Sequence, residues 1–155
     1  MAKIDTLQKP RSKLFTIIIA GVLGTLAFNA VMYADIAITG IPVDIVATMG
    51  SLAVGESEHA EIIGHVIHFG NGIGLALLFG YVALPISKRI KKLPVIAYGI
   101  IFAIVELIVA VWFVMLPMLG AGVAGLDIAP EVAVVTLVRH IVFGTVIGFV
   151  MRREY

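Results

Sequence analysis

Residues 93–119 read LPVIAYGIIFAIVELIVAVWFVMLPML, and Glu106 is the only charged residue in this stretch. A helix needs roughly 20 apolar residues to cross a hydrocarbon core of about 30 Å. The stretch is therefore long and apolar enough to be a transmembrane helix, and it decides the fold class. Three further stretches have the same character, at residues 14–38, 62–86 and 132–151. The sequence thus predicts an all-α bundle of four transmembrane helices.

The composition excludes a soluble domain. The chain has 155 residues, of which 61% are hydrophobic and 14% charged, whereas soluble domains carry about 25% charged residues. This length suits one integral membrane domain over residues 1–155. Because the chain has no cysteine, disulfides, thiolate-bound metals and covalently attached haem are excluded. The net charge of +1 gives no support to nucleic-acid binding, so the expected partners are membrane lipids and other membrane subunits, or a second copy of the chain.

Basic residues gather at one end of the four predicted spans. Ten of the eleven lysines and arginines lie before the first span, between the second and third, or after the fourth: Lys3, Lys9, Arg11, Lys13, Lys88, Arg89, Lys91, Lys92, Arg152 and Arg153. The two loops at the other end contain none. By the positive-inside rule, we expect a plasma-membrane protein with both termini in the cytoplasm.

The first outer loop contains a further apolar segment, residues 42–54, which is too short to span. Pro42 suits the first helical position and Asp44 the first turn, and apolar residues recur at helical spacing from Ile45 onward. We expect a short amphipathic helix, which either connects the spans at the surface or forms a lid over a site below it.

Small residues spaced four apart predict close helix contacts in three of the spans. The pairs are Gly21 with Thr25, Gly70 with Gly74, and Gly144 with Gly148.

Polar side chains inside the spans converge at one depth. With a rise of 1.5 Å per residue, Glu106 lies roughly 20 Å from the inner end of its span. Arg139 and His140 lie roughly 10–12 Å below the outer boundary. His65 and His68 lie on one stripe of the second span, roughly 4–9 Å below the same boundary. A charge at this depth is costly unless it is paired, so this layer is the candidate site.

Four interpretations of the layer remain open. Glu106 and Arg139 can form a structural ion pair, with the histidines bonded to polar neighbours. Alternatively, His140 with His68 or His65 can hold a b-type haem, with Arg139 beside a propionate. The three histidines and Glu106 can also bind copper or zinc. The last interpretation is a proton or transport path through Glu106.

Two short motifs and the overall layout carry a resemblance. The first is Ala-Gly-x-x-Gly-Thr at residues 20–25, and the second is Arg-His-x-x-x-Gly at residues 139–144. With the short helix after the first span, these stretches make the chain similar to small uncharacterised four-helix membrane proteins of archaea and bacteria. The resemblance implies a fold and no activity.

The sequence lacks the motifs of hydrolytic and phosphate-binding sites, and short loops leave little room for catalytic machinery. We therefore expect a small accessory subunit of a larger membrane complex, of respiratory or oxidase type, that is not an enzyme on its own. The alternatives are a membrane redox protein that binds b-type haem, copper or zinc through its histidines, and a small oligomeric transporter.

Overall fold

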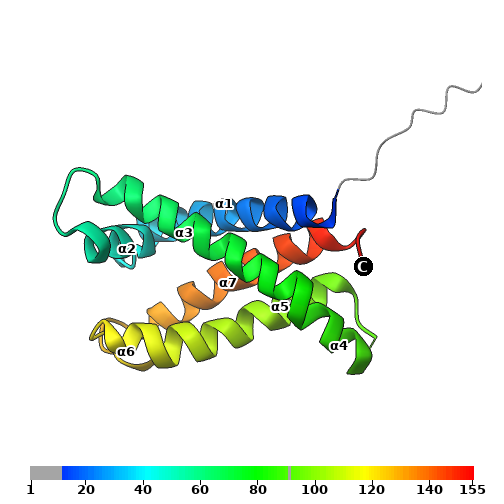
Figure 1. Ribbon diagram of the computed structural model, residues 1–155. Helices are drawn as coiled ribbons and strands as arrows, with labels where there is room; N and C mark the ends of the chain where they lie inside the picture. Colours follow the sequence, from blue (N-terminus) through cyan, green and yellow to red (C-terminus); the bar gives the residue numbers. More distant parts are fainter. Residues whose placement is uncertain (1–11, 91) are drawn as a thin grey trace, which may run out of the picture.

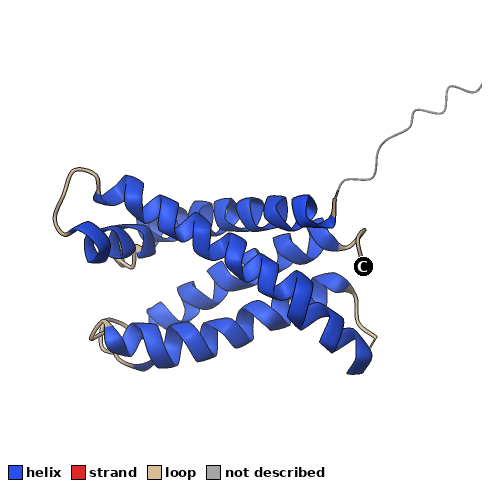
Figure 2. Ribbon diagram, in the orientation of Figure 1, coloured by secondary structure: helices blue, strands red, loops and turns tan. Residues whose placement is uncertain are grey.

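The computed structural model describes residues 12–90 and 92–155, and within them it contains helices and no strand. The elements in chain order are α1 (Lys13–Thr39), α2 (Ile45–Val54), α3 (Ala60–Leu78), η1 (Phe79–Ala83), α4 (Leu84–Ile90), α5 (Val95–Glu106), η2 (Leu107–Met115), α6 (Leu116–Met118), η3 (Val123–Gly125) and α7 (Glu131–Met151). The all-helical fold is confirmed (Figure 2).

Four helical stretches are long and apolar enough to cross a membrane, which makes this a multi-pass membrane protein. They are Lys13–Thr39, Ala60–Ile90, Val95–Met118 and Glu131–Met151. Each predicted span matches one of them, with ends that differ by a few residues.

The helices form two halves that cross each other (Figure 1). One half holds α1, α2 and the outer part of α3, and the other holds α5, η2, α6 and α7. The close contacts are those of α5 with α7, α7 with α1, α1 with α3, and α3 with α2. The two halves therefore meet along α1 and α7, whereas α3 and η2 lie on opposite sides of an open flank.

Glycines set a close crossing between two membrane-spanning helices in each half. A Cβ on Gly21 would lie 2.7 Å from Ile73 Cα, so α1 and α3 touch through their backbones. A Cβ on Gly144 would lie 2.5 Å from the carbonyl oxygen of Gly99, which brings α7 equally close to α5. Two of the three predicted small-residue pairs thus lie at helix contacts. The prediction of a helix contact at the third pair, Gly70 with Gly74, is wrong, because a Cβ at either position would meet nothing within 4 Å.

The short helix α2 begins at Ile45 rather than at Pro42. The Asp44 carboxylate accepts hydrogen bonds from the backbone N–H groups of Val46 and Ala47, at 2.9 and 3.0 Å. Asp44 is therefore the N-cap and not a first-turn residue. From this start α2 lies along α3, where a Cβ on Gly64 would lie only 2.0 Å from the Val46 carbonyl oxygen.

Two spans widen into π-helical segments, and each of these is closely followed by a proline. Pro85 follows η1 and Pro117 follows η2. A proline has no N–H, and its ring clashes with the carbonyl four residues earlier. In both segments the backbone instead forms hydrogen bonds between residues that are five apart in the chain, such as the bond from the Leu116 N–H to the Val111 carbonyl. The sequence analysis did not predict either segment, although a proline inside an apolar span is the signal for one.

The inner end of the bundle is closed by the C-terminal residues. The Tyr155 hydroxyl donates to the carbonyl of Gly80, which lies in η1 of the second span. The Thr16 hydroxyl donates to the Glu154 carboxylate at 3.0 Å, which joins α1 to the chain after α7. The halves are thus tied together at this end and diverge toward the other (Figure 1).

We predict that Gly64→Ala destabilises the protein, because its methyl group would overlap the α2 backbone. The expected loss is about 1–3 kcal/mol of unfolding free energy, as for overpacked cores. Gly70→Ala is the matched control on the same helix, where the methyl group meets open space. It should leave the melting temperature unchanged or slightly raised, because alanine favours helix. Thermal unfolding in detergent measures both, and equal losses from the two variants would contradict the contact.

Candidate functional site

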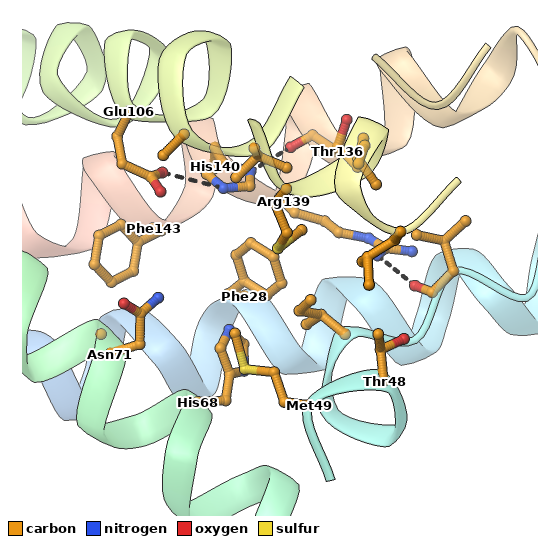
Figure 3. Close-up of a pocket in the computed structure, with 18 of the residues that line it drawn as sticks. Phe28, Thr48, Met49, His68, Asn71, Glu106, Thr136, Arg139, His140 and Phe143 are labelled. Atoms are coloured by element: carbon orange, nitrogen blue, oxygen red, sulfur yellow. Dashed lines mark hydrogen bonds and ion pairs between the residues drawn. The ribbon is translucent and has the colours of Figure 1, made fainter. Parts of the chain in front are cut away.

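A cavity of about 490 Å³ lies between the two halves of the bundle (Figure 3). Its wall is largely apolar and includes Phe28, Met49, Val111, Met115 and Phe143. Polar side chains line it as well: Thr25, Thr48, His68, Asn71, Glu106, Thr136, Arg139 and His140. The predicted polar layer is thus gathered around one cavity, apart from His65.

The cavity is open between α3 and η2. Asn71 on α3 and Ala110 on η2 both line it, and both are exposed. Each lies well inside its apolar span, so in a membrane this opening faces the hydrocarbon rather than water.

The η2 wall depends on the π-helical geometry. Glu106, Ala110, Val111 and Met115 all line the cavity, at intervals of four or five residues. Hydrogen bonds between residues five apart give η2 more residues per turn than an α-helix has, so residues at intervals of four or five share a face. An ordinary α-helix, with 3.6 residues per turn, would rotate Met115 away from the face of Glu106.

Glu106 and His140 face each other across the α5–α7 contact. The His140 Nδ1 lies 2.7 Å from the Thr136 carbonyl oxygen, and since a carbonyl only accepts, Nδ1 carries a proton. The other ring nitrogen, Nε2, lies 3.3 Å from the Glu106 carboxyl group. A stable contact there needs one more proton, on the imidazole or on the carboxyl. In either arrangement the pair is neutral overall.

Arg139 pairs with Asp35 on α1, and the predicted pairing of Glu106 with Arg139 is wrong. The guanidinium Nε donates to Asp35 Oδ2 at 2.7 Å, and one terminal nitrogen donates to Oδ1. The other terminal nitrogen donates to the Val43 carbonyl at 2.7 Å. Arg139 is only 1% exposed, so its charge is fully enclosed. The correction has a simple cause: the sequence places two carboxylates in the outer half but does not show which one lies nearer.

His68 has no hydrogen bond within the described residues, although it is buried. It is 7% exposed, and its Nδ1 is buried without a partner. The side chain lies against Phe28, with ring centroids 5.1 Å apart and the rings nearly perpendicular. Phe28 makes the same contact with His140 on its other side, also at 5.1 Å. Figure 3 shows Phe28 between the two histidines.

This arrangement does not fit the predicted haem. His68 and His140 would have to face a porphyrin from opposite sides, but the Phe28 ring stands between them. Both ring nitrogens of His140 are also engaged by neighbours, and Arg139 is bound to Asp35 rather than open to a propionate.

The predicted copper or zinc ligands are not brought together. His65 does not line the cavity; its Nε2 lies 3.4 Å from the Tyr33 hydroxyl on the outer face of α1 and α3. Within residues 12–90 and 92–155, no group of three or more histidine, aspartate or glutamate side chains is placed to hold a metal ion. The i, i+3 spacing put His65 and His68 on one side of α3, but only His68 points inward.

Thr136, a residue not predicted from the sequence, forms a hydrogen bond with the only tryptophan of the chain. The Trp112 indole N–H donates to the Thr136 hydroxyl at 3.0 Å, and that hydroxyl donates to the Val132 carbonyl at 2.7 Å. Because Thr136 lines the cavity, the Trp112 indole is hydrogen-bonded directly to a residue of the cavity wall.

We predict that Asp35→Ala and Arg139→Ala each destabilise the protein by about 3–5 kcal/mol, because each leaves the other charge buried and unpaired. The double variant should lose much less than the sum of the two. A double-mutant cycle of thermal unfolding measures this coupling. The matching cycle of Glu106→Ala with Arg139→Ala should be nearly additive. A larger coupling for Glu106 than for Asp35 would contradict the observed pairing.

Comparison with known proteins gives one match. The model of a family of unknown function (DUF6789) matches residues 12–154, which include all four spans and the whole cavity. No curated protein matches the chain, and no solved structure matches it. The chain belongs to the DUF6789 family.

Proposed function

We propose that this protein is a small accessory subunit of a larger membrane complex, of respiratory or oxidase type, and that it holds a lipid-soluble molecule within the bilayer. The observation that carries the proposal is the cavity of about 490 Å³ that opens between α3 and η2. Ligand sites are typically apolar cavities of a few hundred Å³ or more with a small number of placed polar groups. A molecule dissolved in the hydrocarbon can enter this one directly from the side.

The polar side chains of the cavity favour binding over catalysis. The two charged residues that line it, Glu106 and Arg139, already have partners in His140 and Asp35. No arrangement of a nucleophile beside a free base lines the cavity. What the wall offers is apolar contact and a few hydrogen bonds.

The surface of the third span supports a role within a complex. Ile101, Val105, Val109 and Phe113 follow one another at four-residue spacing, and each is about half exposed or more. The span packs mainly on α7, so this stripe is free to contact lipid or another membrane subunit. The described chain outside the helices consists of short loops, and such loops give little material for a catalytic domain.

Purification of the protein from its native membranes in mild detergent tests both parts of the proposal. Native mass spectrometry should show a retained lipid-soluble molecule and further membrane subunits. Ala110→Phe fills the opening of the cavity and should abolish retention of the small molecule without loss of the subunits. The matched control is Val114→Phe, an exposed position on η2 that does not line the cavity. It should retain both.

Two outcomes would count against this function. A chain that purifies alone, or only with further copies of itself, would refute the accessory role. Equal retention of the small molecule by the Ala110 and Val114 variants would show that it is not held in the cavity.

We further propose that the protein resides in the plasma membrane with both termini in the cytoplasm, on the basis of its ten basic residues at one end. Because the chain has no cysteine, single-cysteine variants report the orientation. Ser57→Cys, in the loop between α2 and α3, should react with an impermeant maleimide on intact cells. Ser12→Cys, before α1, should react only after permeabilisation. The reverse pattern would overturn the orientation.

A further inference from the structure

We infer that the cavity takes a neutral aromatic ring that carries two oxygen substituents and an alkyl tail, a molecule of the quinone or hydroquinone class. This inference rests on the proposed function and specifies its ligand. It follows from three properties of the wall, namely its charge balance, its hydrogen-bonding groups and its aromatic residues.

The first property is that the wall carries no uncompensated charge. The guanidinium of Arg139 is paired with the Asp35 carboxylate, to which it donates two hydrogen bonds, and it donates a third to the Val43 carbonyl. Glu106 and His140 lie 3.3 Å apart, and with one proton between them they are neutral as a pair. An anionic head group such as a carboxylate or a phosphate would therefore meet no free cation to compensate its loss of hydration. The wall selects a neutral molecule.

The second property is that two hydrogen-bonding groups lie on opposite sides of the cavity. His68 projects from α3, with Nδ1 buried and unpartnered. The Glu106–His140 pair lies on the other side, on α5 and α7, and Phe28 stands between them (Figure 3). A buried polar atom without a partner is costly, so a ligand that forms a hydrogen bond with His68 removes this cost. Because Phe28 fills the direct line between the two sides, the ligand ring would lie beside Phe28 in the cavity, with one oxygen directed toward each side.

With one proton between them, Glu106 and His140 can form a hydrogen bond with either the carbonyl or the hydroxyl form of such a ligand. When the proton is held between the two residues, it can be offered to a carbonyl oxygen. When the ligand is a hydroxyl, a carboxyl oxygen of Glu106 can accept its hydrogen. His68, as a neutral imidazole, likewise has one donor and one acceptor nitrogen. We therefore expect both the carbonyl and the hydroxyl forms to bind.

The third property is the aromatic and thioether lining. Phe28 and Phe143 contribute rings to the wall, and Met49 and Met115 contribute thioethers. Aromatic side chains attract another ring in edge-to-face or offset geometry, and methionine sulfur makes favourable contacts with ring edges. The alkyl tail would leave through the opening between Asn71 and Ala110, into the hydrocarbon.

A series of four probes tests this inference on the full chain in phosphatidylcholine nanodiscs. The probes are decylbenzene, 4-decylphenol, decylhydroquinone and decylbenzoquinone, which share a tail and differ in their ring oxygens. The emission of Trp112, the only tryptophan, reports the binding, either directly or by competition with the benzoquinone. We expect the affinity to rise by about tenfold from decylbenzene to the phenol and again to the hydroquinone, since one hydrogen bond contributes about 1 kcal/mol or somewhat more. The benzoquinone should bind about as tightly as the hydroquinone.

His68→Leu should remove most of the gain from the ring oxygens and leave the affinity for decylbenzene unchanged. The variant should fold, because the His68 side chain makes no hydrogen bond within the described chain that the substitution would remove. His65→Leu is the matched control, the same residue type on the same helix but outside the cavity. It should keep the full preference for the oxygenated rings.

The outcomes separate the two levels of the proposal. If all four probes bind equally in the wild type, the cavity holds lipophilic molecules but does not recognise the ring oxygens, and the inference fails while the proposed function stands. If no probe binds, although native protein retains a small molecule, the ligand class is wrong. If no probe binds and nothing is retained in the native protein, the binding function fails as well. Equal loss of preference from the His65 and His68 substitutions would also refute the assigned contact.

Discussion

The burial of Arg139 is the constraint on which the outer half of this protein depends. A guanidinium inside the bilayer must be paired, and here the partners come from two separate elements, Asp35 on α1 and the Val43 carbonyl before α2. One side chain therefore fixes α7 against α1 and fixes the approach to α2. Since α2 is in turn packed against α3 through Gly50 and Gly64, the position of α3 on that side also depends on this contact.

The sequence predicts the fold well because the membrane imposes simple rules on it. Length and hydropathy are enough to locate four spans, since each must cross the same thickness of hydrocarbon. The existence of α2 is also evident from its apolar spacing. Its start is not, because Asp44 suits both a first turn and a cap, and only the hydrogen bonds to Val46 and Ala47 distinguish the two.

The site is predicted in its depth but not in its pairings. The 1.5 Å rise places Glu106, His68, Arg139 and His140 in one layer, and the structure gathers them around one cavity. Which groups touch depends on the rotation of each helix and on the identity of its neighbours, and one sequence gives neither. For this reason Arg139 was assigned to the wrong carboxylate. The π-helical segment η2 adds a further rotation, which a regular helical period does not anticipate.

The unpartnered nitrogen of His68 has a thermodynamic consequence. Nδ1 of His68 is buried without a hydrogen-bond partner among the described residues, and an unsatisfied buried polar atom costs about 1–3 kcal/mol. Any molecule that binds the folded state and not the unfolded chain adds stability that grows with the logarithm of its concentration. Binding of the proposed ligand would thereby link the lifetime of this protein in the membrane to the supply of that ligand. The amount of protein in the membrane would then rise and fall with the amount of ligand.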